Sequence, residues 1–156
     1  MKEIGLECRR ADLDHAQIVE LLSTHTQKAL GAARCRSGHA LGVDALRNPE
    51  IEVRAIWRDG APVAVGAIRR MSSDHGELKS MYVTDSARGT GLGTVLLEHL
   101  IETARRHGMT RLSLETGASG YFDPARRLYA RHQFEACEAF AGLSSHPDSV
   151  FMTRSI

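Results

Sequence analysis

Apolar and β-branched residues gather in short stretches that predict β-strands. The two longest, residues 51–57 and 62–71, are separated by Asp59-Gly60, a pair typical of a two-residue hairpin turn. Residues 78–83 form another such stretch, which a turn at Asp85 and Ser86 ends. Shorter predicted strands lie at residues 4–10, 111–115, 134–140 and 149–153.

Apolar residues at a spacing of three or four predict the helices. The clearest helix follows Gly93, and Gly108 is placed to end it. Its apolar stripe comprises Val95, Leu96, Leu97, Leu100, Ile101 and Ala104. The buried side of a helix capped by Asp12 comprises Leu13, Ile18, Leu21 and Leu22.

Two further helices are shorter. One spans residues 43–47, and Asn48-Pro49 stops it. The other is capped by Asp123, has Pro124 at its first position and runs to about Arg131. Residues 28–42 and 116–121 are predicted loops.

The order of these elements predicts an α/β fold with a mixed, mostly antiparallel central sheet flanked by helices. Strands 51–57, 62–71 and 78–83 follow one another through short turns, which favours antiparallel pairing. The long helix separates strand 78–83 from strand 111–115, which makes these two parallel. At 156 residues the chain is expected to form a single domain, residues 1–156.

Three alternate glycines follow an arginine in the sequence Arg88-Gly89-Thr90-Gly91-Leu92-Gly93, between a strand and the start of a helix. Glycine lets a ligand approach the main chain, and the free N–H groups of a first helical turn attract an anion. A diphosphate suits this loop; the alternative is that the glycines only allow close helix packing. Neither the dinucleotide fingerprint nor the Walker motif fits the spacing.

The loop resembles the acetyl-coenzyme A loop of the GNAT family of N-acetyltransferases, Arg/Gln-x-x-Gly-x-Gly/Ala, which Arg88, Gly91 and Gly93 match. Residues 128–134, LYARHQF, are similar to the Leu-Tyr-x-x-x-Gly-Phe segment of that family, and LETG at 114–117 recurs in a bacterial branch. Gln133 stands where the family usually has glycine, so a turn expected to need positive φ is made by a less tolerant residue. Phe122 stands where many members have an asparagine that contacts the pantetheine.

This resemblance implies a GNAT fold and an N-acetyltransferase that moves an acetyl group from acetyl-CoA to a primary amine by direct attack in a ternary complex. It implies acetyl-CoA as cosubstrate and no metal. The residues implied in binding acetyl-CoA are Met81, Tyr82, Val83, Arg88, Gly89, Thr90, Gly91, Leu92, Gly93 and Thr94. Within this set, a main-chain N–H of Tyr82 or Val83 is expected to stabilise the acetyl oxygen.

The acceptor amine must lose a proton, since a lysine-like amine has a pKa of about 10.4. Glu77 is the first candidate for the general base, because the histone acetyltransferase branch has a glutamate at the matching position. Glu77 could instead pair with Lys79 on the same face of the strand. Glu115, at the end of the next strand, and a chain of water molecules are the alternatives.

The thiolate of coenzyme A leaves more readily if a proton is supplied to it. Tyr129 lies where family members place a general-acid tyrosine, so the resemblance implies that its phenol serves as the acid. The alternative is that Leu128 and Tyr129 are a packing pair on a helix, with the hydroxyl at its rim.

Composition limits the classes of molecule that the protein is expected to bind. Twenty Lys and Arg against 19 Asp and Glu give a net charge of +1, which gives no reason to expect nucleic acid or a membrane surface and favours a small-molecule amine over a basic protein tail. Three cysteines without a C-x-x-C pair, and eight histidines without metal-site spacing, indicate neither disulfides nor a metal centre. With no signal-peptide pattern, we expect a cytoplasmic protein.

Two other functions are compatible with the same residues. A non-catalytic acyl-CoA-binding module would keep the glycine-rich loop without turnover, and a protein-interaction domain on this scaffold would bind no acetyl-CoA. Many members of the family pair as dimers, so a homodimer is a further expectation from the resemblance.

Overall fold

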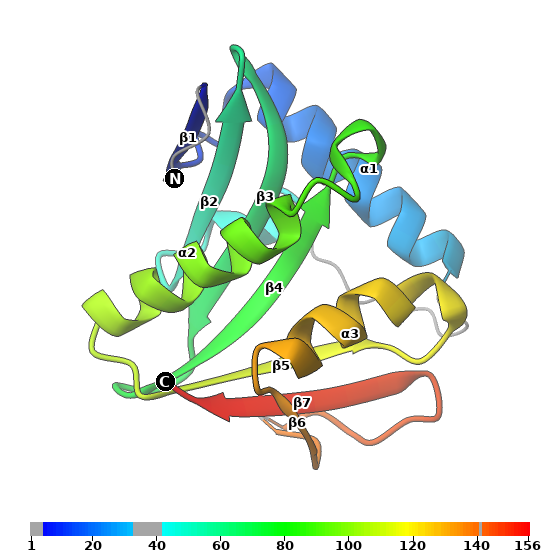
Figure 1. The fold of residues 1–156 in the computed structure, drawn as a ribbon. Helices are drawn as coiled ribbons and strands as arrows, with labels where there is room; N and C mark the ends of the chain where they lie inside the picture. Colours follow the sequence, from blue (N-terminus) through cyan, green and yellow to red (C-terminus); the bar gives the residue numbers. More distant parts are fainter. Residues whose placement is uncertain (1–4, 33–41, 141) are drawn as a thin grey trace.

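A twisted seven-stranded sheet forms the centre of the molecule, in the order β1-β2-β3-β4-β5-β7-β6 (Figure 1). The computed structural model describes residues 5–32, 42–140 and 142–156. The strands are β1 (Leu6–Arg10), β2 (Ile51–Arg58), β3 (Ala61–Arg70), β4 (His75–Val83), β5 (Arg111–Gly117), β6 (Glu135–Cys137) and β7 (Ser149–Ser155). The helices are α1 (Ala16–Ala32), α2 (Leu92–Arg106) and α3 (Asp123–Arg131), with 3₁₀ turns η1 (Ala45–Arg47), η2 (Asp85–Ala87) and η3 (Gly120–Phe122).

The predicted α/β fold and its mixed, mostly antiparallel sheet are confirmed. Strands β1 to β4 pair antiparallel in sequence order, and β4 and β5, which α2 connects, are the parallel pair. The turn between β2 and β3 has Asp59 at φ 51° and Gly60 at φ 84°, the left-handed conformations that a two-residue hairpin needs. Strand β7 enters between β5 and β6 and pairs antiparallel with both.

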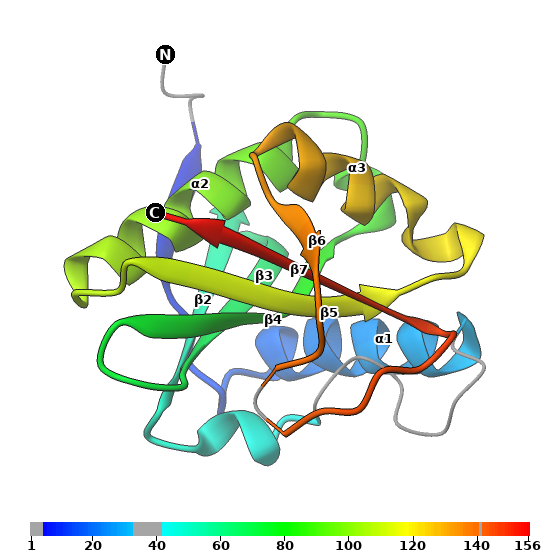
Figure 2. The same cartoon turned by 90° about the horizontal axis from the view of Figure 1, so that it is seen from below.

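The helices cover the two faces of the sheet (Figure 2). Helix α1 packs on one face, where Ile18 and Leu22 contact a cluster from β2, β3 and β4 that includes Val53 and Tyr82. Helices α2 and α3 cover the other face. The larger apolar cluster lies there, around Leu96, Leu97 and Leu100 of α2, all fully buried. The predicted stripe of α2 is thus the centre of the core, apart from Val95, which is exposed.

Strands β4 and β5 pair over only four residues, from His75 with Arg111 to Leu78 with Leu114. Beyond Leu78 the pairing of β4 with β3 shifts register, and Ser80 in the bulge has a φ of 55°. The free end of β4 then pairs with β3 alone, and that of β5 with β7 alone. The two strands therefore diverge, as Figure 1 shows.

Several boundaries differ from the sequence-based expectations. Helix α1 begins at Ala16, because the Asp12 carboxylate accepts a bond from the N–H of Asp14 within the preceding turn. It continues to Ala32, so the loop predicted from residue 28 is wrong over 28–32; residues 33–41 lie outside the described part. Residue 4 of the first predicted strand also lies outside it.

The elements around the end of β5 differ as well. Strand β5 extends through Gly117, and η3 occupies part of the predicted 116–121 loop. Asp123 is not the N-cap of α3: it lies inside the first turn, and its carboxylate pairs with Arg126. The predicted strand 134–140 forms only over Glu135–Cys137.

Gly117→Ala should destabilise the protein. An added Cβ at this position would lie 2.1, 2.2 and 2.9 Å from three carbons of the Phe122 ring, and an aromatic ring in a buried site cannot bend aside. Overpacking of this kind costs about 1–3 kcal/mol, so thermal unfolding should occur several degrees lower. Gly120→Ala is the matched control, since its nearest neighbour would be 3.9 Å away. Equal melting temperatures for the two variants would contradict this packing.

Candidate active site

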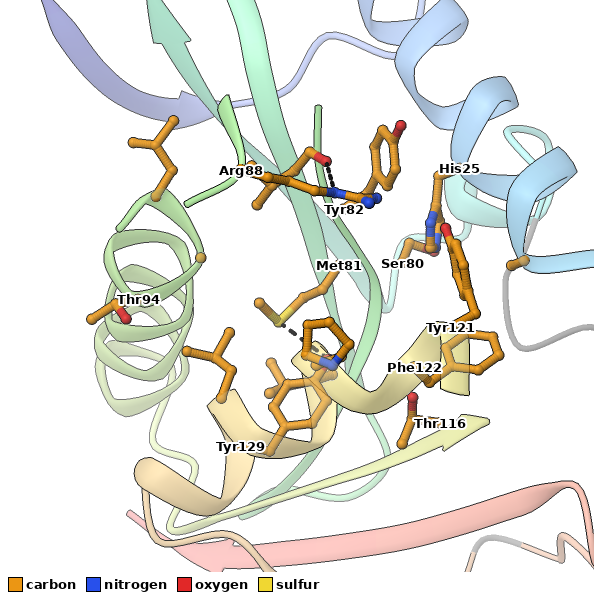
Figure 3. Close-up of a pocket in the computed structure, with 18 of the residues that line it drawn as sticks. His25, Ser80, Met81, Tyr82, Arg88, Thr94, Thr116, Tyr121, Phe122 and Tyr129 are labelled. Carbon is orange, nitrogen blue, oxygen red and sulfur yellow. Dashed lines mark hydrogen bonds between the residues drawn. The ribbon is translucent and has the colours of Figure 1, made fainter. Parts of the chain in front are cut away.

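A pocket of about 450 Å³ occupies the gap between the diverging ends of β4 and β5. Its walls come from β4, the start of α2, the end of β5, η3, α3 and the His25–Ala29 side of α1 (Figure 3). Most of the predicted site residues line it, namely Met81, Tyr82, Val83, Arg88, Gly89, Gly91, Leu92, Gly93, Thr94 and Tyr129. The topology therefore gathers residues from β4, the glycine-rich loop and α3 around one cavity.

The glycine-rich loop has the backbone that its glycines predict. Gly89 has a φ of 75°, and Gly91 has a φ of 84° as the residue preceding α2. The first α-helical hydrogen bond of α2 runs from the Val95 N–H to the Gly91 carbonyl at 3.2 Å. The N–H groups of residues 92–94 come before this bond and so have no acceptor within the helix. Its N-cap residue is Gly91, which has no side chain to cap this end. Main-chain N–H groups and the positive helix end thus meet at one rim of the pocket, an arrangement suited to phosphate.

Arg88 is held beside this rim by weak contacts. Its guanidinium lies 3.3 Å from an Asp85 carboxylate oxygen and 5.7 Å from the centre of the Tyr82 ring, and its Nε donates to the Val83 carbonyl at 3.4 Å (Figure 3). Asp85 also binds the Nζ of Lys28 at 2.6 Å, and this bond lowers the pKa of the Asp85 carboxyl. About half of the Arg88 side chain is exposed, so it can turn toward a bound anion.

Strand β4 presents an unpaired main-chain edge to the pocket. The Thr84 N–H donates to the Val63 carbonyl of the β3 side at 2.9 Å. Successive residues of a strand direct their N–H groups to opposite edges, so the Val83 N–H is directed toward the gap. Of the two candidates for stabilising the acetyl oxygen, Val83 is the one whose N–H has this direction.

Tyr129 of α3 is buried in the wall of the pocket. Its hydroxyl donates to the Met81 sulfur at 3.6 Å (Figure 3), and its ring packs edge-on against Phe134. Burial raises the pKa of the Tyr129 phenol well above its usual value. The group is therefore a neutral hydrogen-bond donor over the whole physiological pH range. The turn after α3 has Gln133 at a φ of 68°, as the departure from glycine predicted.

Two predicted residues do not line the pocket. Thr90 turns back and bonds the Ala87 carbonyl, which stabilises the turn before the loop. Glu77 is 1% exposed and belongs to the paired part of β4. Its carboxylate contacts the Arg69 guanidinium at 3.0 Å and the Lys79 ammonium at 3.2 Å, so the pairing with Lys79 that the sequence left open is present. Glu115, the alternative base, does line the pocket.

Sequence reasoning did not name several polar residues of the pocket wall as site residues, among them His25, Lys79, Ser80 and Arg131. His25 carried a usable signal, because it falls at i+3 and i+4 from Leu22 and Leu21, on the apolar face of α1. A polar residue in such a stripe is either satisfied in the core or faces a cavity. Ser80 carried no signal, since a bulge at a non-glycine residue cannot be read from the sequence.

The described residues contain neither a metal-binding cluster nor a helix that could span a membrane. Within residues 5–32, 42–140 and 142–156, no group of three or more His, Cys, Asp or Glu side chains is placed to hold a metal ion. None of the helices that the structure describes has the length and apolar character needed to cross a bilayer.

Comparison with known proteins identifies the class to which this fold and pocket belong. The model of the Acetyltransferase (GNAT) family matches residues 16–134. The uncharacterized N-acetyltransferase YsnE of Bacillus subtilis is 39% identical over 145 residues, which cover 93% of this chain and 96% of that protein. The uncharacterized N-acetyltransferase YedL of Escherichia coli is 33% identical, with 93% and 91% covered.

Solved structures agree with this class. A Klebsiella pneumoniae structure described as an acyl-CoA N-acyltransferase superposes with a TM-score of 0.80 at 26% identity, covering 96% of this chain and 97% of that one. A GNAT acetyltransferase of Elizabethkingia anophelis, solved with acetyl-CoA bound, shares the fold with a TM-score of 0.73 at 14% identity, covering 99% and 100%. The chain belongs to the acetyltransferase (GNAT) family. It is an acyltransferase, as the loop and the LYARHQF segment indicated.

Proposed function

We propose that the protein binds acetyl-CoA with its diphosphate on the 88–94 loop and transfers the acetyl group directly to the primary amine of a small molecule. One observation carries this proposal: the N–H groups at the start of α2, the free edge of β4 and the Tyr129 hydroxyl all border one pocket. The acetyl-CoA-bound relative of the same fold supports the choice of donor.

Along β4 the pantetheine arm would lie as an added strand, bonded by the main chain of Met81, Tyr82 and Val83. The Val83 N–H would point at the thioester carbonyl. When the amine attacks, negative charge develops on that oxygen, and a donor already in place stabilises it without reorganisation. Gly89, Gly91, Leu92, Gly93, Thr94 and Arg88 would bind the phosphates, with Thr90 supporting their turn.

The reaction would proceed through a tetrahedral intermediate. The amine nitrogen forms a bond to the acetyl carbon, the amine loses a proton to a base, and the carbon–sulfur bond breaks to release the coenzyme A thiolate. Tyr129, neutral and in the same pocket, would donate a hydrogen bond to the departing sulfur. The products are an N-acetylated amine and coenzyme A.

Glu77, Glu115 and a water chain remain the candidates for the base, and the lining of the pocket favours Glu115. Glu115→Gln should lower kcat about 10²- to 10⁴-fold, the range for loss of a general base. Glu77→Gln should instead cost stability, about 1–3 kcal/mol, because it leaves two partly exposed cations without their carboxylate.

Steady-state kinetics and thermal unfolding of the two variants decide between these roles. Loss of turnover in Glu77→Gln at an unchanged melting temperature would restore Glu77 as the base. Full activity in both variants would favour a water chain.

The near-neutral net charge supports a small acceptor rather than a basic protein tail, and three cysteines without a C-x-x-C pair suit the reducing cytoplasmic location that we propose. A homodimer stays a prediction that light scattering can measure.

Two measurements test the function as a whole. Calorimetry should register acetyl-CoA binding, and release of free thiol should depend on an added amine from a panel. Binding without amine-dependent turnover would favour the non-catalytic acyl-CoA module. The absence of any binding would favour a protein-interaction domain instead.

A further inference from the structure

Two buried polar atoms of the pocket wall have no hydrogen-bond partner among the described residues. They are the Nδ1 of His25, a residue 8% exposed, and the Oγ of Ser80, a residue 4% exposed. Leaving such a group unpaired is costly, so native proteins nearly always satisfy it with protein, water or ligand. Both residues line the pocket, whereas Trp57, which also has an unpaired buried nitrogen, does not.

The fold holds both side chains at the α1 side of the pocket, across from α2 (Figure 3). His25 projects from the apolar face of α1, and its ring lies 5.3 Å from that of Tyr82 on β4. Ser80 is the bulge residue of β4, at a φ of 55°. The glycine-rich loop, on which we place the diphosphate of acetyl-CoA, lies at the start of α2. The opposite, α1 side of the pocket is therefore the side left for the acceptor.

The charges at this side of the pocket suit a molecule with two opposite charges. Burial lowers the pKa of His25 to about 4, so its imidazole is neutral at physiological pH and can donate one N–H. Lys79 also lines the pocket, and the group formed by Arg69, Glu77 and Lys79 carries one more positive than negative charge. Glu115 supplies a carboxylate to the same cavity.

We propose that His25, Ser80 and Lys79 form a subsite for the carboxylate of the acceptor, and that the acceptor is an amino acid acetylated on its amine. This deepens the proposed function and rests on it. Each of the three side chains can donate a hydrogen bond, and a carboxylate only accepts them. Glu115 then faces the amine, and the rings of Tyr121 and Phe122, which also line the pocket, suit an apolar side chain.

The test compares common L-amino acids with the amines that lack only their carboxylate, for example L-phenylalanine with 2-phenylethylamine. We expect the wild-type protein to prefer the amino acid in kcat/KM by about ten- to a hundredfold, the effect of a hydrogen bond to a charged group. His25→Phe keeps a ring against Tyr82 and removes both nitrogens, and Ser80→Ala removes the hydroxyl. Each should reduce that preference about tenfold.

Two controls separate binding from folding. Ser23→Ala lies on the exposed side of α1 and should keep the wild-type preference. Thermal unfolding of the free protein should show no loss of stability in His25→Phe or Ser80→Ala, because the Nδ1 of His25 and the Oγ of Ser80 bond no other described residue. A lower melting temperature with an unchanged preference would mean that the two residues are merely structural, and would overturn the subsite.

The outcomes also separate this proposal from the one on which it rests. If acetyl-CoA fails to bind in calorimetry, the proposed function fails. In a second case, acetyl-CoA binds, but no amino acid is preferred to its matched amine. If this holds both in turnover and in calorimetric binding of the amino acid to the protein–coenzyme A complex, only the carboxylate subsite fails.

Discussion

Gly91→Glu should abolish acetyl-CoA binding, so that calorimetry registers no heat on mixing. The main-chain N–H of Gly91 and those of the first turn of α2 lie at the rim of the pocket on which we place the diphosphate. A glutamate there puts a negative charge against the phosphates and beside the helix end that would attract them. An added Cβ would meet no atom within 4 Å, so the variant should still fold. Its φ of 84° costs a side chain only about 1–2 kcal/mol.

Gly108→Glu is a matched control at the other end of the same helix. Gly108 has a φ of 81° and equally open surroundings, and it does not line the pocket. Both variants should lose similar stability, but Gly108→Glu should bind acetyl-CoA like the wild type. Wild-type affinity in Gly91→Glu would show that the phosphates bind elsewhere. Equal loss in both would mean that helix strain, and not charge at the loop, controls binding.

Tyr129→Phe should lower kcat about 10- to 100-fold while acetyl-CoA affinity stays within a few-fold. General acids contribute about 10²–10⁴-fold to a rate, and a thiolate with a pKa of about 8.5 depends on one less than most leaving groups do. The phenylalanine ring keeps the edge contact with Phe134 and loses only the hydroxyl that faces the Met81 sulfur. Unchanged turnover would remove Tyr129 from the mechanism.

The pH profile supplies a second readout for Tyr129. Burial raises the pKa of this phenol, so the protonated form that can donate persists as the pH rises past 10. The ionisation of Tyr129 should therefore cause no decline in the wild-type kcat near pH 9 to 10. In this range the pH profile of Tyr129→Phe should have the same shape as that of the wild type. Because all three tyrosines of the chain line the pocket, neither of the other two can serve as a matched Tyr→Phe control. Thermal unfolding of Tyr129→Phe is therefore the control for a packing effect.

The sequence was most informative where local rules and the fold agree. Helix α2 and its loop were predictable because a strong apolar period is bounded by Gly91 and Gly108, both of which adopt positive φ. The Asp59-Gly60 hairpin was predictable for the same reason, since both of its turn residues adopt positive φ. These features depend on a few neighbouring residues, and that is the range over which sequence patterns are decisive.

The shape of the pocket depends on longer-range features. The point where β4 and β5 part follows from the bulge at Ser80, a serine whose neighbours give no reason to expect positive φ. The Glu77 carboxylate lies against two cations because Arg69, on the neighbouring strand β3, supplies a second one that no spacing rule links to it. The continuation of α1 from residue 28 to Ala32, past Gly31, was likewise not evident from local sequence, although Ala29 in this part is fully buried.

The walls of the cavity come from separate parts of the chain. Those nearest the position that we propose for the diphosphate belong to residues 81–94, whereas those on the proposed acceptor side belong to α1, to residues 79 and 80 and to residues 115–122. Exchange of side chains in the second group would leave the nucleotide contacts untouched. In the arrangement that we propose, selectivity for the acceptor can therefore be re-engineered from α1, from residues 79 and 80 of β4 and from residues 115–122, while the donor stays the same.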